Sequence, residues 1–129
     1  AMYKPFHLIG LELSISVLNI ALRSEPTGQS KAWRGDAVAV AKRALKAGET
    51  LDGEGGYTVY AKLIPAARSL SLGGLPIGLA SHVTLLRDVA AGEFVKAADV
   101  ALDETAQAVR VRREMERDAQ VSAKVMAAE

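Results

Sequence analysis

The chain contains one sequence pattern twice, 44 residues apart. Residues 41–55 read AKRALKAGETLDGEG, and residues 85–99 read LLRDVAAGEFVKAAD. The positions that agree combine apolar residues with an arginine, a glycine and a glutamate at fixed spacing. The matched pairs are Arg43 and Arg87, Leu45 and Val89, Ala47 and Ala91, Gly48 and Gly92, Glu49 and Glu93, and Leu51 and Val95. This repeat predicts that both segments fold in the same way.

Each copy has the pattern of a strand, a tight turn, a short extended piece and a polar turn. Gly48 and Gly92 lie where the turn reverses the chain, and we expect both to have positive φ. Left-handed backbone costs most residues on the order of 1–2 kcal/mol and costs glycine far less. A single hairpin is only marginally stable in water. We therefore expect the two hairpins to pack together into one core.

The segments outside the repeat have different patterns of apolar and polar residues. Residues 6–22 are apolar on two sides at helical spacing, which is typical of a buried helix. Residues 23–30 contain proline and glycine and read as a linker. Residues 57–64 alternate as a strand does. Residues 105–129 are rich in helix formers, and we expect an exposed or loosely docked helix there that frays after about Val121.

The composition limits the classes of partner. Sixteen Lys and Arg face fifteen Asp and Glu, which argues against nucleic acid as a partner. The absence of cysteine excludes disulfides and thiolate zinc sites. The apolar stretch 6–22 is shorter than the roughly 20 residues that a membrane span needs. With no secretory signal visible, we expect a cytoplasmic protein. Ala1 and Met2 have the pattern of a tag remnant.

The repeated pattern resembles a known domain. AxxxLxxGExL followed by Asp, at Ala41–Asp52 and again at Leu85–Asp99, resembles the SAF domain. That domain has a β-clip fold, made of short strands folded back in long hairpins, and occurs in sialic acid synthases, altronate dehydratases and flagellar or pilus assembly proteins. The resemblance implies a mainly β fold with an apolar helix before it and a helix after it.

Two further stretches resemble the C-terminal region of homoserine-dehydrogenase-like oxidoreductases. They are YKPFHLIGLELSIS, residues 3–16, and LDGEGGYTVYAKLIP, residues 51–65. Proteins of that group have an N-terminal Rossmann domain, a catalytic domain and a SAF-like tail. Some relatives are NADPH-dependent reductoisomerases of 1-deoxyxylulose 5-phosphate.

The resemblance implies a division of the chain and a role for it. Residues 3–31 would be the last catalytic-domain helix and a linker, residues 32–104 the SAF-like domain, and residues 105–129 a C-terminal helix. The chain would then be a non-catalytic accessory or oligomerisation domain, excised from an NAD(P)-dependent oxidoreductase. Its partners would be the missing Rossmann and catalytic domains and further copies of itself. The alternative is a free-standing SAF-type module that binds a sugar acid or acts as an assembly chaperone.

Few residues are candidates for chemistry. His7 could contribute to the active site of a full-length parent, although a local hydrogen-bonding role is favoured. Arg43 and Arg87 are candidate ligand or interface residues, against the alternative of solvated strand-end arginines. His82 reads as a surface residue. No dinucleotide fingerprint GxGxxG and no phosphate loop is present, so NAD(P)H would bind the parent and not these residues.

Other polar groups read as structural. Asp52 and Glu54, flanked by Gly53 and Gly55, lack the spacing of an EF-hand and favour a turn, so we expect no metal site. The tripeptide at residues 34–36, RGD, is interpreted as chance. The arginines of the last segment, Arg112 among them, alternate with acidic residues and predict a solvated helix face.

Overall fold

The computed structural model describes residues 5–6, 8–28 and 32–126, with the side chains of residues 121–126 excepted. The chain divides into two compact units, Ala1–Ala32 and Trp33–Glu129. The first unit holds helix α1 (Ile9–Leu18), which continues as a π-helical turn to Arg23 and ends at Ser24 in left-handed backbone. The predicted helix is therefore present. His7 and the expected tag remnant lie outside the described residues.

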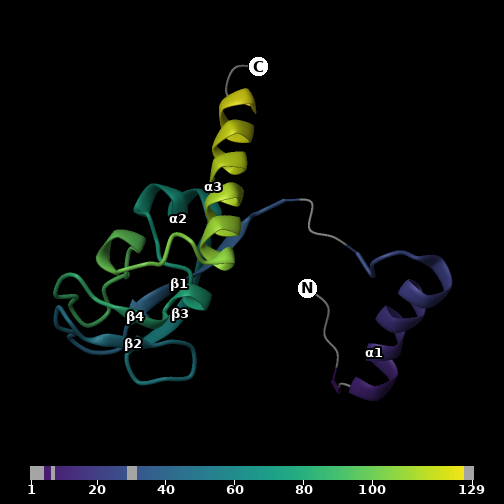
Figure 1. The fold of residues 1–129 in the computed structure, drawn as a ribbon, viewed down its shortest axis with the longest axis horizontal. Helices are drawn as coiled ribbons and strands as arrows, with labels where there is room; N and C mark the ends of the chain where they lie inside the picture. Colours follow the sequence, from purple (N-terminus) through teal and green to yellow (C-terminus); the bar gives the residue numbers. More distant parts are fainter. Residues whose placement is uncertain (1–4, 7, 29–31, 127–129) are drawn as a thin grey trace. The chain divides into compact units, whose positions relative to one another are not determined.

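The second unit combines two small sheets with helices (Figure 1). Its strands β1 (Gly35–Ala41) and β3 (Val59–Pro65) pair antiparallel over their full length, as do β2 (Thr50–Asp52) and β4 (Ser81–Thr84) with one irregularity. Its elements in chain order are β1 (Gly35–Ala41), β2 (Thr50–Asp52), β3 (Val59–Pro65), α2 (Ala66–Leu72), the 3-10 turn Ile77–Leu79, β4 (Ser81–Thr84), the 3-10 turn Ala97–Asp99 and α3 (Gln107–Met126).

The two repeats face each other through matching backbone hydrogen bonds. Gly48 donates to the carbonyl of Leu85 and Gly92 donates to that of Ala41, both at 2.8 Å. Ala41 and Leu85 are equivalent positions in the two copies, so each bond is the counterpart of the other. Gly48 has φ 87° and Gly92 has φ 78°. The prediction of two glycine-centred reversals that pack together is confirmed.

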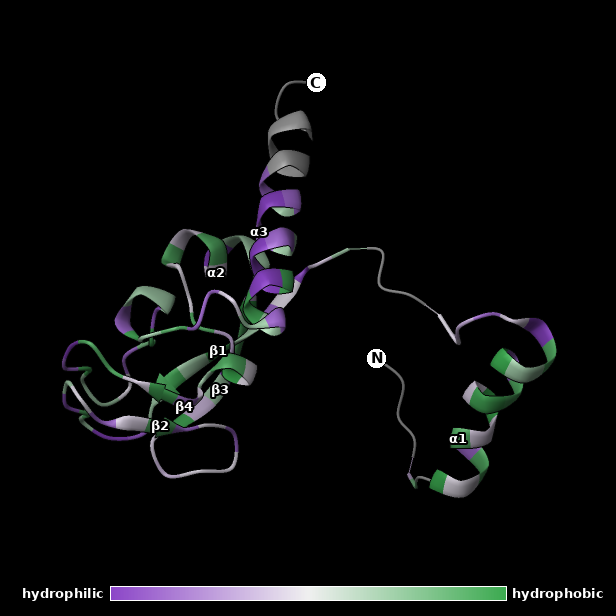
Figure 2. Ribbon diagram, in the orientation of Figure 1, coloured by the Kyte–Doolittle hydropathy of each residue, from purple (hydrophilic) through white to green (hydrophobic). Residues whose placement is uncertain are grey.

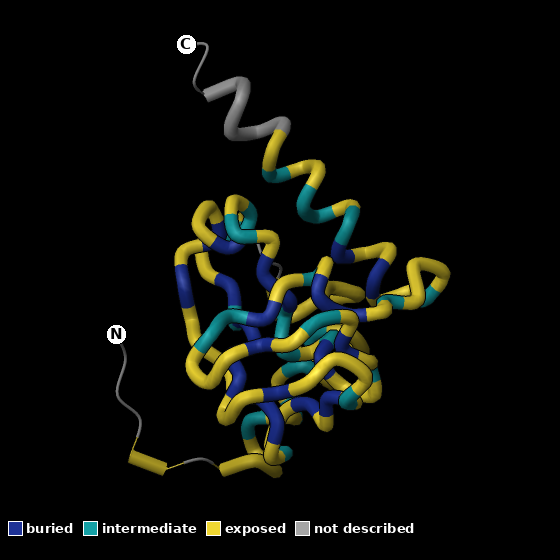
Figure 3. The backbone as a smooth tube through the Cα atoms, turned by 90° about the vertical axis from the view of Figure 1, so that its left-hand side faces the viewer, coloured by how far each residue is buried: buried dark blue, intermediate teal, exposed yellow. Residues whose placement is uncertain are grey.

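The hydrophobic core cluster of the second unit is built from alanine, valine and leucine side chains. Buried segments from both sheets and from the loops between them converge in the interior (Figure 3). This agrees with a sequence poor in aromatic residues, in which Ala, Val and Leu must do the packing. The core residues are Ala39, Ala41, Leu45, Leu51, Val59, Leu75, Ala80, Leu85, Val89, Val95 and Val100.

The expectation of a mainly β fold is met only in part. Small antiparallel sheets and the two flanking helices are present, but the strands are short and most of the repeat consists of turns and isolated bridges. Hydrogen bonds such as Val95 to Ala39, 2.9 Å, replace long strands in these segments. The fold is therefore a mixture of helix and strand.

The last helix differs from its prediction. We expected α3 to be exposed or loosely docked and to fray after about Val121, but its backbone is helical to Met126 and its first turns pack on the domain. Val109 and Arg112 are both buried, one helical turn apart on the same face. Alternation of charge along the sequence did not reveal this face.

Helix α1 is apolar without a buried face in its own unit. None of its residues is buried, and most of its ribbon has hydrophobic colours in Figure 2. Within the described part of the chain, no helix is both long and apolar enough to cross a membrane.

Candidate functional site

The candidate site is the pair of turns, residues 43–49 and 87–93, which we call the paired turns. In each, the N–H of the glutamate bonds to the carbonyl three residues earlier, Glu49 to Lys46 at 3.0 Å and Glu93 to Ala90 at 3.1 Å. The glycine before the glutamate supplies the positive φ of the turn. The repeat thus builds two β-turns of the same kind at one end of the unit.

The glutamate side chain closes each turn a second time. A carboxylate oxygen of Glu49 accepts the N–H of Lys46 at 2.6 Å, and Glu93 accepts the N–H of Ala90 at 3.0 Å. The other carboxylate oxygen of each glutamate pairs with the arginine of its own repeat. The Ala-Gly-Glu sequence therefore sets the backbone conformation of each turn and also provides the carboxylate that pairs with the arginine of that repeat.

Both candidate arginines are in ion pairs within the chain. Arg43 contacts Glu49 at 2.7 Å, and the equivalent Arg87 contacts Glu93 at 2.8 Å. The Arg43 guanidinium holds the pKa of Glu49 below its usual range, and Arg87 does the same for the pKa of Glu93. These contacts give the arginines a role in holding the turns, and a ligand or interface role for them stays a prediction.

Arg87 has a second carboxylate partner, which none of the described residues provides for Arg43. The carboxylate of Asp99, which is buried, accepts Arg87 Nε at 2.6 Å and Arg87 Nη2 at 2.9 Å. The residue equivalent to Asp99 in the first repeat is Gly55. The hydrogen bonds that Arg87 donates, to Asp99 first and then to Glu93, raise its pKa. The second turn is therefore held more firmly to the domain than the first.

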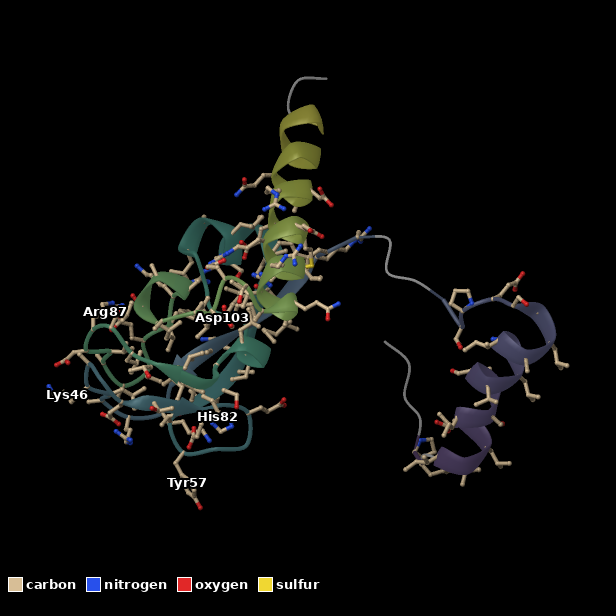
Figure 4. The ribbon with its side chains drawn as sticks, in the orientation of Figure 1. Lys46, Tyr57, His82, Arg87 and Asp103 are labelled. Carbon is tan, nitrogen blue, oxygen red and sulfur yellow. The ribbon has the colours of Figure 1, made fainter. Side chains whose placement is uncertain are left out.

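One ion pair joins the two turns directly. Lys46 Nζ lies 2.7 Å from a carboxylate oxygen of Asp88, whose other oxygen accepts the N–H of Ala47 at 2.9 Å. Lys46 and Arg87 lie at the same end of the unit (Figure 4). The hydrogen bond from Lys46 lowers the pKa of Asp88. The exposed side chains of Lys46 and Asp88 thus link the two turns through an ion pair.

The glycine-rich loop after β2 is organised by Asp52. Its carboxylate accepts the N–H groups of Tyr57 at 2.5 Å and of Thr58 at 3.0 Å, and the hydroxyl of Thr58. These hydrogen bonds, that of the Thr58 hydroxyl first, lower the pKa of Asp52 to about 2. Asp52 therefore caps a loop, and no group of three or more metal-ligating side chains occurs among the described residues.

His82 does not join the paired turns. His82 has φ 57° at the irregularity between β2 and β4, and its side chain is exposed. Figure 4 shows it on the side of the unit that carries the Tyr57 loop. Histidine tolerates left-handed backbone better than most residues. His7 falls outside the part of the chain that the structure describes.

Sequence reasoning missed the buried ion pair between Asp36 and Arg112. The guanidinium binds the carboxylate through two hydrogen bonds, of 3.0 and 2.6 Å, and lies 4.5 Å from the ring centre of Trp33. Ser69 adds a third hydrogen bond to Asp36, 2.5 Å. Burial acts to raise the pKa of Asp36, but the hydrogen bonds from Arg112 and Ser69 outweigh it and the pKa is lowered.

This ion pair corrects two interpretations. Asp36, assigned to a chance RGD, is a buried anchor in β1, and Arg112, assigned to a solvated helix face, docks α3 onto it. The available signal was the helical spacing of Val109, Arg112 and Glu116, which places the arginine on the same face as a buried valine.

No protein-family model matches this chain, and no curated protein matches it.

Proposed function

We propose that the chain is a non-catalytic SAF-like accessory module that helps assemble a larger protein, a cytoplasmic NAD(P)-dependent oxidoreductase. In this proposal the second unit is the folded module, and α1 is the element that attaches it to the catalytic body. The nicotinamide cofactor and the substrate bind to other domains of that protein. The paired turns then serve the architecture of the module.

The observation that carries the proposal is the exposure of α1. Each of its large apolar side chains is more than half exposed, from 51% at Leu18 to 76% at Ile9. An exposed Leu or Ile forgoes roughly 1.5–3 kcal/mol relative to a buried one. A helix of this composition is stable only when another surface covers it. In the larger protein that surface is the catalytic domain, and in the isolated chain it is a second copy.

The charges of the second unit support an architectural role. Arg43, Lys46 and Arg87 each pair with a carboxylate of the same module. A guanidinium that already has two carboxylates, as Arg87 has, binds an anionic substrate less well because that substrate must displace them. Such pairs favour a stable scaffold over a binding pocket.

Multi-angle light scattering of the whole chain tests the proposal. We expect a dimer or higher oligomer that dissociates when Ile15→Glu places a charge on α1. The control is Leu86→Glu, which changes an equally exposed leucine in the second unit and leaves the assembly intact. A monomeric wild-type chain, or an assembly insensitive to Ile15→Glu, contradicts the proposal. Oxidation of NADPH by the chain alone would contradict the non-catalytic assignment.

A second candidate function, binding of a sugar acid, is favoured by one groove. It lies between the end of α2, the turn Ala97–Asp99 and the start of α3, with a volume of about 400 Å³. Lys96 and Arg113 line it and could contact a carboxylate, although Arg113 already pairs with Glu104 at 2.9 Å. Saturable shifts of the Lys96 and Gly73 amide signals on addition of galactonate would support this candidate.

A further inference from the structure

Strand β3 is an edge strand. Its one strand partner in the described chain is β1, which also forms bridges on its far side to Pro76 and Phe94. Ala61, Lys62 and Leu63, in the middle of β3, are all exposed. An exposed edge presents unpaired backbone groups to which another extended segment can bind.

The hydrogen bonds of β1 show which groups of β3 point outward. Ala39 donates to Leu75 at 2.8 Å and Ala41 donates to Glu93 at 3.0 Å, so the odd-numbered residues of β1 bond to the loops on its far side. In an antiparallel ladder successive residues bond to opposite sides. The even-numbered residues of β1, such as Val38, therefore bond to β3.

The register then assigns the outward groups to two residues. Val38 lies opposite Lys62, so the N–H and C=O of Lys62 face β1. The neighbouring residues Ala61 and Leu63 must direct theirs away from β1. No backbone partner of either occurs within the described chain outside the ladder. These two residues provide two N–H donors and two C=O acceptors for an incoming strand.

The side chains beside this edge differ between its two faces. On one face Lys62 Nζ and the Arg68 guanidinium lie 5.8 and 5.9 Å from the ring centre of Phe94. Neither cation has a carboxylate partner among the described residues. On the other face Leu63 is 76% exposed. Phe94 bridges to Val40 on the far side of β1, so Arg68 is not placed at the outer edge, and Lys62 is the cation that β3 itself carries. The edge strand thus has an exposed lysine on one face and an exposed leucine on the other.

A second copy of the chain fits this edge poorly. Pairing β3 antiparallel with another β3 over its full length places its central residue, Lys62, opposite the same lysine. Like charges directly opposite each other destabilise a strand pair. A carboxylate opposite Lys62 would instead stabilise such a pair.

We propose that the outer edge of β3 binds an extended segment of a partner protein in which acidic and apolar residues alternate. The segment adds a strand through the backbone groups of Ala61 and Leu63. Its acidic side chains lie on the face of Lys62, and its apolar side chains lie on the face of Leu63. The inference uses neither α1 nor the paired turns and is independent of the function proposed above.

Amide hydrogen exchange of the whole chain, read by NMR, tests the inference with a capped nine-residue peptide of alternating Val and Glu. We expect the amide protons of Ala61 and Leu63 to become at least about tenfold more protected when the peptide is saturating. The amide proton of Lys62, which faces β1, is protected already and serves as the internal reference. A peptide of alternating Val and Lys is the control for charge.

Two variants separate the backbone and charge contributions. Ala61→Pro removes an outward donor and leaves the ladder to β1 intact, so it should abolish binding. Lys62→Glu should weaken binding about tenfold, because it reverses the charge that selects the acidic segment. Arg117→Glu makes the same change of net charge on α3 and should leave affinity unchanged.

Three results would overturn the inference. One is unchanged exchange of Ala61 and Leu63 at saturating Val-Glu peptide. Another is equal affinity for the Val-Lys peptide. A third is protection that appears without peptide as the protein concentration rises, since it would assign the edge to a second copy.

Discussion

Leu45 and Val89 each donate a backbone hydrogen bond to the other, at 2.8 and 3.0 Å, so that equivalent residues of the two repeats are direct partners. A residue can pair with its own equivalent only when the two copies are related by an approximate twofold rotation. Both side chains are fully buried between the copies. Neither hairpin therefore completes its core alone, which explains why the chain carries two.

The turn glycines should be sensitive to substitution because of their backbone and not because of crowding. Gly48→Ala should cost about 1–2 kcal/mol of unfolding free energy, since its φ of 87° strains an L residue while nothing lies within 4 Å of an added Cβ. Gly78 has the same open surroundings without positive φ, so Gly78→Ala should cost little. Urea unfolding measures both, and equal losses would contradict this explanation.

The buried pair of Asp36 and Arg112 should be costly to break on one side only. Arg112→Met leaves the carboxylate buried without its counter-ion and should lower stability by about 3–5 kcal/mol. The double variant Asp36→Leu/Arg112→Met should recover much of this loss, because no unpaired charge remains. Arg110→Met, at an exposed position on the same helix, is the control. A double variant as unstable as the single one would show that docking of α3 requires the ion pair itself.

The two equivalent arginines should differ in importance. Arg87→Gln should lower the urea midpoint more than Arg43→Gln, because Arg87 also neutralises the buried carboxylate of Asp99. Within the described part of the chain Arg43 has one carboxylate partner, the partly exposed Glu49, and exposed pairs contribute little. Equal midpoints for the two variants would show that Asp99 does not depend on Arg87.

Stability should fall in acid as Asp52 becomes protonated. Its pKa is about 2 in the folded chain and 3.8 without the hydrogen bonds of the loop. A depressed pKa contributes stability that is complete above 3.8 and is lost as the pH falls toward 2. Asp52→Asn should therefore show a shallower loss of urea stability between about pH 5 and pH 2 than the wild type. Parallel pH profiles for the two proteins would exclude this contribution.

The sequence predicted the structure of the repeat better than that of the rest of the chain. The recurrence of Gly48 and Gly92 predicted both turns, since only local backbone geometry was needed. Arg43 and its partner Glu49 are only six residues apart, so their ion pair is also a local feature. The sequence analysis nevertheless did not predict this pair and kept Arg43 as a candidate ligand or interface residue. Asp99 as a second partner of Arg87 had no equivalent in the first copy, so the repeat could not indicate it.

The sequence by itself determined the local features of this protein: the duplicated reversals, an apolar first helix and an aliphatic core. Each depends on neighbouring residues, whose preferences act over one turn or one strand. The tertiary structure alone decided that Arg112 meets Asp36, 76 residues earlier, and that β3 keeps an open edge. Those outcomes depend on which distant segments come together as the core closes, and neither charge nor periodicity along the chain encodes that choice.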